Sequence, residues 1–171
     1  ESRDPRRLLH SLREDGRSDD NIQLARRRTA GASGAALQAG ALPPFVRVER
    51  TLRLGLEWRV ETRVVRLTPT GSPVTLEVPL LPGESVTSDV HVKAGKAQVS
   101  MGPQAAEAGW TSLLAEQAVV ELKAPASPSW TEQWSLDAGP MWHVSAAGLA
   151  PVRGADGGAR LRVWRPWPGE A

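Results

Sequence analysis

The sequence predicts a mainly β fold: an antiparallel β-sandwich-like domain with a short N-terminal helical extension. Two observations predict the β-domain. Between Val46 and Val64, apolar residues occupy most even positions and charged residues occupy most odd positions. From Phe45 onward, Gly and Pro divide the chain into short runs rich in β-branched and aromatic residues. Because successive side chains of a strand point to opposite faces, the alternation predicts one buried and one solvated sheet face.

Residues 1–42 differ in composition from the rest of the chain. Asp4 and Pro5 are typical of a helix start, and the leucines within residues 8–12 give a narrow apolar stripe. A second helix is expected from Ser18 to the arginines at 26–28. Residues 30–42 are rich in Gly and Ala, which is typical of a connector. We therefore assign residues 1–42 to a helical extension with a Gly/Ala linker and residues 43–171 to the antiparallel β-domain.

The alternating segment is too long for one strand. At about 3.3 Å per residue it would span about 60 Å, whereas strands usually have about three to ten residues. Gly55 is the expected bend, and the change of phase at Val64 and Val65 marks an expected bulge or strand end. The mixed signs on the polar face favour ion pairing between strands over binding to a polyanion.

Two hairpins are expected further along the chain. A two-residue turn of the II′ type at Gly95 and the following residue would set Val92 opposite Val99. A three-residue loop at residues 138–140 would set Leu136 opposite Trp142. More strands are expected near residues 74–80, 118–122 and 159–164. Short strands with frequent turns favour a sandwich or a related antiparallel fold.

Composition excludes several functional classes. The chain has 171 residues, enough for one domain with an appendage, and it contains no cysteine for a disulfide or a thiolate metal site. Its net charge is +2, and arginine and glutamate are interleaved rather than separated on two faces, so we expect no nucleic-acid partner. No run approaches the about 20 apolar residues of a transmembrane helix, so we expect no membrane span within the chain.

No motif indicates catalysis. The histidines have no carboxylate or second histidine at metal-ligand spacing, and they are His10, His91 and His143. No serine lies in a Gly-x-Ser-x-Gly elbow, and no Gly-rich stretch fits a phosphate cradle. We expect no catalytic residue, no metal site and no cofactor, and the chain is not predicted to be an enzyme.

An alternative interpretation is a hydrolase in which Glu132 is the catalytic acid. This residue lies between Trp130 and Trp134 on the apolar phase of an expected strand, where desolvation could make it the acid of a hydrolase. The preferred interpretation is an edge-strand residue whose side chain bends to solvent or meets an arginine.

Tryptophan supplies most of the aromatic mass, with seven residues against one Phe and no Tyr. Three share the phase of aliphatic neighbours and are expected in the core: Trp58, Trp134 and Trp142. Three others are expected to be exposed: Trp110, Trp164 and Trp167. Together with Arg165 they form the predicted interaction surface, where Trp164 and Trp167 favour packing on a neighbouring domain. The alternative is a set of exposed rings that bind sugar.

Two phrases of the chain share an ending. Residues 79–84 read Pro-Leu-Leu-Pro-Gly-Glu, and residues 166–170 read Pro-Trp-Pro-Gly-Glu. Because the first phrase leads into an expected strand, we expect Ala171 to precede a further strand of a larger protein. Residues 76–86 and 164–170, with the alternating segment, resemble segments of large uncharacterised envelope proteins of GC-rich Gram-negative bacteria. The resemblance implies a periplasmic β-rich region of a membrane-anchored protein and brings no known active site.

These observations lead to one functional hypothesis and one alternative. The hypothesis is a non-catalytic extracytoplasmic β-domain, in the periplasm or cell envelope, with a structural or protein-interaction role in a larger envelope protein. Its expected partners are other domains of the same protein or other envelope proteins. The alternative is a carbohydrate-binding module that binds glycan through exposed tryptophans.

Overall fold

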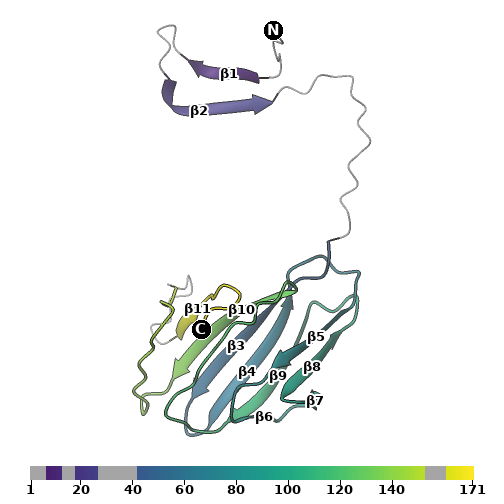
Figure 1. Cartoon of the computed structure of the whole chain (residues 1–171), viewed down its shortest axis with the longest axis vertical. Helices are drawn as coiled ribbons and strands as arrows, with labels where there is room; N and C mark the ends of the chain where they lie inside the picture. The colour runs from purple at the N-terminus through teal and green to yellow at the C-terminus, as the bar shows by residue number, and fades with distance from the viewer. Residues whose placement is uncertain (1–6, 13–17, 27–41, 153–160) are drawn as a thin grey trace. The chain divides into compact units, whose positions relative to one another are not determined.

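The computed structural model describes residues 7–12, 18–26, 42–152 and 161–171. The chain divides into two compact units, Glu1–Gly40 and Ala41–Ala171. In the first unit, β1 (Arg7–Leu12) pairs antiparallel with β2 (Ser18–Arg26), as Figure 1 shows. The second unit contains the strands from β3 to β11, and its fold is mainly β with two largely antiparallel sheets.

In the first unit, Leu9 of β1 lies opposite Leu24 of β2. The helices expected within residues 1–42 extend into ranges outside the described residues, so the helical extension stays a prediction. Residues 30–41 of the predicted linker lie outside the described residues.

The main sheet of the second unit has six strands in the order β11-β10-β3-β4-β9-β6. Their bounds in chain order are β3 Val46–Leu54, β4 Trp58–Arg66, β6 Glu84–Val86, β9 Glu107–Leu114, β10 Trp130–Ala138 and β11 Leu161–Trp164. β10 runs parallel to β3, and the other neighbouring pairs of this sheet are antiparallel. The long strands β3 and β4 therefore form the centre of the sheet.

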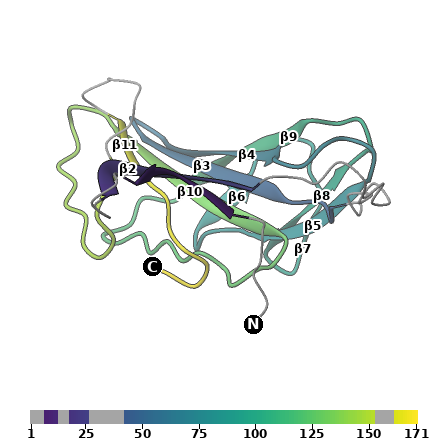
Figure 2. The same cartoon turned by 90° about the horizontal axis from the view of Figure 1, so that it is seen from above.

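A smaller sheet of three strands covers part of the main sheet, in the order β5-β8-β7. Its bounds are β5 Val74–Pro79, β7 Val92–Lys93 and β8 Lys96–Met101. Figure 2 shows the two layers, with β3, β4 and β9 along the top and β5, β7 and β8 at the lower right. Buried residues of both sheets form one core cluster: Val46, Val48, Val64, Val74, Leu76, Val78, Ala97, Val99, Met101 and Trp110. The domain is thus sandwich-like over this half of the main sheet.

Irregular segments cover the other half of the main sheet. Residues 115–129 and 139–151 contain no strand. Partly buried side chains of these segments, such as Leu122 and Val144, pack against a second core cluster. The buried members of that cluster are Leu52, Leu54, Trp58, Val60 and Leu114. Here the second layer of the domain is built from loops instead of strands.

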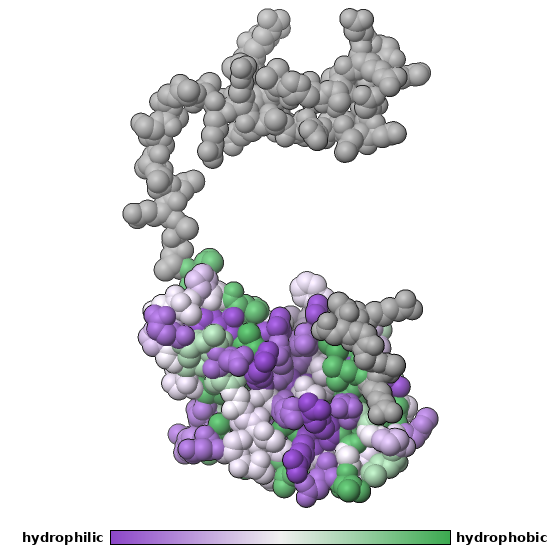
Figure 3. All heavy atoms as spheres, turned by 180° about the vertical axis from the view of Figure 1, so that it is seen from behind, coloured by the Kyte–Doolittle hydropathy of each residue, from purple (hydrophilic) through white to green (hydrophobic). Residues whose placement is uncertain are grey.

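The alternating segment forms β3 and β4, and the predicted bend at Gly55 is confirmed by the turn between them. Even positions of both strands face the core, and odd positions are half-buried or exposed. On the outer face, Arg53 donates hydrogen bonds to Glu61 (2.8 Å) and to Asp137 (3.1 Å), and the hydrogen bond with Glu61 raises the pKa of Arg53. Figure 3 shows hydrophilic residues gathered across the middle of the domain seen from behind. The predicted ion pairing between strands is therefore confirmed.

The hairpin of β7 and β8 turns one residue earlier than the sequence predicts. Ala94 and Gly95 form the turn and both have positive φ, 50° and 71°. Two successive positive values are typical of a type I′ turn, which matches the twist of the paired strands. Val92 therefore lies opposite Ala97 and not opposite Val99.

The prediction of a hairpin directly after β10 is wrong. β10 pairs with β3 on one side and with β11 on the other. Trp142 lies in an irregular segment, where its ring packs edge-on against Trp58 with the ring centroids 5.1 Å apart. The strand expected at residues 118–122 is likewise absent, because these residues belong to the irregular cover. Alternating apolar residues occur both in strands and in loops whose apolar side chains pack against a sheet, so the alternation alone does not distinguish the two.

Gly109 of β9 lies against β4 without room for a side chain. A Cβ atom there would lie 2.8 Å from the backbone oxygen of Thr62, so Gly109→Ala forces the two strands to shift. We expect this substitution to lower the free energy of unfolding by about 1–3 kcal/mol, measured by urea denaturation. Gly102→Ala is the matched control, because nothing lies within 4 Å of its Cβ position. An equal loss in both variants would contradict the close approach.

Glu77 and Lys96 form an exposed pair across β5 and β8. Lys96 Nζ donates a 3.1 Å hydrogen bond to Glu77 Oε2, which lowers the pKa of Glu77 below its ordinary value of 4.5. Because the folded-state pKa is the lower one, the pair stabilises the fold above the ordinary pKa of Glu77. That stabilisation disappears as the pH falls through the folded-state pKa. We expect Lys96→Gln to raise the pKa of Glu77 in a carboxyl NMR titration, and an unchanged pKa would disprove the assignment.

Candidate functional site

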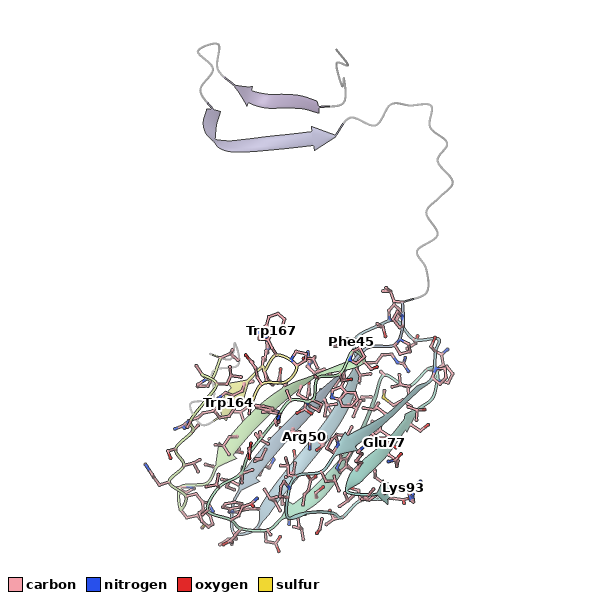
Figure 4. All side chains as sticks on the ribbon, in the orientation of Figure 1. Phe45, Arg50, Glu77, Lys93, Trp164 and Trp167 are labelled. Atoms are coloured by element: carbon pink, nitrogen blue, oxygen red, sulfur yellow. The ribbon has the colours of Figure 1, made fainter. Side chains whose placement is uncertain are left out.

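Three charged side chains lie close together on the core-facing side of the main sheet. Arg50 is in the middle of β3 at an even position, so the strand turns its side chain inward, and it is 3% exposed. Figure 4 shows it in the middle of the domain. Glu132 of β10 is also 3% exposed, and the side chain of Glu84, the first residue of β6, is fully buried. We call these three residues the buried charge cluster.

The guanidinium of Arg50 joins the parts of this cluster. Its Nη2 donates a 2.7 Å hydrogen bond to the backbone oxygen of Pro79. Its Nε lies 3.6 Å from Glu132 Oε2, and its Nη1 lies 3.9 Å from Glu84 Oε2. Because Pro79 ends a strand of the smaller sheet and Glu132 belongs to the main sheet, a single side chain links both layers.

Each carboxylate of the cluster has one engaged oxygen and one free oxygen. Trp134 Nε1 donates a 2.5 Å hydrogen bond to Glu132 Oε2, from two residues along the same face of β10. The backbone N–H of Leu81 donates a 2.7 Å hydrogen bond to Glu84 Oε2. Both Oε1 atoms, together with Arg50 Nη1, are buried and have no hydrogen-bond partner among the residues that the structure describes.

Two residues of the buried charge cluster, Arg50 and Glu132, line a pocket of about 180 Å³. Arg50 and Glu132 form its buried end. Its sides come from the connection that follows β5 and from the segment at residues 121–125, and they are largely apolar. Exposed Glu121 and Lys123 line the same pocket, so its mouth carries one charge of each sign.

The predicted interaction surface is only partly exposed. Trp110 is 5% exposed and Trp164 is 8% exposed, so the expectation that they lie at the surface is wrong. Trp110 stands on the core-facing phase of β9 and packs between the sheets. Trp164 lies directly opposite Trp134 on the neighbouring strand and packs in the same cluster. Trp167 and Arg165 remain exposed.

Glu132 meets an arginine, which is one part of its preferred interpretation. The other part is wrong, because β10 lies between β11 and β3 and is not an edge strand. Glu121 supplies a second carboxylate to the lining of the same pocket. The pocket, at about 180 Å³, is smaller than the about 300–1,000 Å³ of most small-molecule sites. Its size therefore gives no support to a glycan substrate.

The histidines do not form a site in the described chain. His91 and His143 are exposed, and the side chain of His10 lies outside the part that the structure describes. Within residues 42–152 and 161–171, no group of three or more His, Cys, Asp or Glu side chains could hold a metal ion. Across the same ranges, no helix is long and apolar enough to cross a membrane.

Arg50 and Glu84 are not among the residues predicted from the sequence, although a signal for one of them exists. Arg50 and Glu132 are opposite charges on the apolar phases of two strands, and a charge turned inward requires a partner. Glu84 gives no such signal, because its carboxylate reaches the core only through a turn that begins at Leu81.

No protein-family model, no curated protein and no solved structure matches the chain. The function is therefore inferred from the chemistry of the described residues.

Arg50 and Arg53 form a matched pair on β3, because each has two carboxylate partners but only Arg50 is buried. Arg50→Met leaves two buried carboxylates without their cation, so we expect a loss of about 3–5 kcal/mol of unfolding free energy. Arg53→Met removes an exposed network and should cost only about 0–1 kcal/mol. Urea denaturation measures both values. A loss for Arg50→Met no larger than that for Arg53→Met would contradict the role of the buried charge cluster.

Proposed function

We propose that the second unit is a non-catalytic protein-interaction domain of a larger envelope protein, located outside the cytoplasm. The observation that carries this proposal is the turn at residues 166–170, which presents Trp167 to solvent with 75% of the residue exposed. In Figure 4 this side chain projects from the margin of the domain. The resemblance of the chain to periplasmic segments of envelope proteins supports the location.

The turn that presents Trp167 is fixed at several points. The backbone N–H of Trp167 donates a 2.7 Å hydrogen bond to Glu170 Oε2, and the Glu170 N–H donates to the Trp167 oxygen at 3.0 Å. Gly169 and Glu170 also exchange backbone hydrogen bonds with Ala124, at 2.8 and 2.7 Å. A turn held in this way loses little conformational entropy when a partner binds.

The two phrases with the same ending form the same kind of turn but differ in exposure. Leu81 begins an identical turn, because Glu84 accepts its N–H and donates back to its oxygen. Leu81 packs partly buried on the core, whereas Trp167 faces water. Tryptophan and arginine are the residues most enriched at interaction hot spots, and Arg165 is exposed two positions before Trp167.

The carbohydrate-binding alternative has weaker support. A sugar platform uses several exposed aromatic faces, but the other six tryptophans are buried or half-buried. A lone exposed ring on a fixed turn is better suited to insertion between side chains of a partner protein.

Site-specific cross-linking tests the proposal. A photoreactive p-benzoylphenylalanine placed at position 167 of the full-length protein, expressed in its native host, should give one discrete adduct. Mass spectrometry should identify it as another domain of the same protein or an envelope protein. Arg165→Glu should reduce the yield, because it reverses a charge beside the contact.

Position 56 is the matched control, because Leu56 is 84% exposed on the turn between β3 and β4. Adduct formation that is equal from both positions, or absent from position 167, would disprove an interaction at this turn. Binding of the domain to peptidoglycan or to a glycan array, with loss of that binding in Trp167→Ala, would establish the carbohydrate alternative instead.

A further inference from the structure

The N-terminal hairpin places two arginines at directly opposed positions. Arg7 of β1 lies opposite Arg26 of β2, at the open end of the hairpin (Figure 1). Opposed residues of an antiparallel pair have Cβ atoms about 5 Å apart, so like charges at such positions destabilise the pairing. Neither Asp nor Glu occurs within residues 7–10 or 23–26, which form this part of the ladder. An anion supplied from outside the hairpin would therefore stabilise this register.

The charge of this end of the hairpin suits a phosphate group. Arginine presents parallel N–H donors that match two phosphate oxygens, and the opposite charges strengthen each hydrogen bond. The acidic residues of β2 are Asp19 and Asp20, near the other end of the strand. The sequence continues the positive charge, with Arg6 before β1 and Arg27 and Arg28 after β2. The open end is therefore the part of the hairpin that attracts an anionic surface.

Leucines lie next to the arginine pair on both faces of the hairpin. Leu9 and Leu24 are opposed, two positions from the arginine pair and hence on the same face. Leu8 lies opposite Ala25, so this apolar pair belongs to the other face. A protein surface covers one face of a ribbon, whereas lipids surround both. An isolated two-stranded hairpin is at best marginally stable in water, so contact with lipid would also stabilise the strand pairing.

We propose that the open end of the hairpin docks on an anionic phospholipid surface. Arg7 and Arg26 bind a lipid phosphate group, and the neighbouring leucines lie at the boundary between headgroups and acyl chains. Apolar residues at this boundary and cationic residues at the phosphates are the usual arrangement of segments that lie in the membrane interface. The contact uses no residue of the second unit, so it stands independently of the proposed function.

Co-sedimentation of the full chain with lipid vesicles tests the proposal. One set of vesicles contains phosphatidylcholine alone, and the other contains about one third phosphatidylglycerol, which carries the negative charge. We expect the full chain to bind the anionic vesicles at least about tenfold more tightly than the neutral ones. High salt should weaken binding to the anionic vesicles, because it screens the attraction between exposed charges.

Substitutions in the hairpin separate lipid binding from strand pairing. Arg7→Glu places opposite charges at opposed positions, which favours the hairpin, but it removes positive charge from the surface that meets the lipid. We expect it to weaken binding to the anionic vesicles by at least about tenfold. Leu9→Ala should weaken binding by about fivefold, because less apolar surface enters the interface.

Arg162→Glu is the matched control, because it makes the same change of charge at an exposed position of the second unit. It should change the affinity for the anionic vesicles by less than about twofold. The proposal is overturned if the full chain sediments equally with both kinds of vesicle or if Arg7→Glu binds as tightly as Arg162→Glu. Calorimetric binding of inorganic phosphate or duplex DNA, without binding to the anionic vesicles, would overturn it as well.

Discussion

The burial of one arginine is the constraint on which the second unit depends. The alternation of β3 turns Arg50 into the core, and a guanidinium taken out of water needs several partners to offset its lost hydration. It takes them from Pro79 at the end of β5, from Glu132 of β10 and from Glu84 at the start of β6. Elements far apart in the sequence must therefore meet at the middle of β3.

The core changes character on the two sides of this cluster. Toward the start of β3, valines of the main sheet pack against the smaller sheet, and toward its end, Leu52 and Leu54 are covered by irregular segments. The pocket opens where the two kinds of cover meet, beside the connection that follows β5. That connection contains a turn of the same kind as the one that presents Trp167, since Glu84 and Glu170 each accept the N–H of the residue three positions earlier. One kind of turn thus begins at Leu81 beside the pocket and at Trp167 on the surface.

Local patterns explain which parts of this fold follow from the sequence. β3 and β4 were predictable because burial of one sheet face imposes a period of two on the apolar residues. The turn at Gly55 was predictable because the alternating segment is too long for one strand. No local pattern in the sequence indicates that β10 pairs with β3 on one side and with β11 on the other. The position of Trp164 in the core, opposite Trp134, therefore could not be predicted. Part of the site could be recognised in the sequence, because Arg50 and Glu132 are opposite charges at positions where apolar residues alternate. Their contact could not be predicted, because the two residues lie far apart along the chain.

The central claim is that Arg50 and Glu132 are coupled in the core much more strongly than similar ions at the surface. A double-mutant cycle in urea denaturation tests it most directly, with Arg50→Met and Glu132→Gln singly and together. The same cycle on Arg53 and Glu61, across the outer face, is the reference. We expect a coupling free energy above about 1.5 kcal/mol for the buried pair and below about 1 kcal/mol for the exposed pair. Equal coupling in the two cycles would contradict the account.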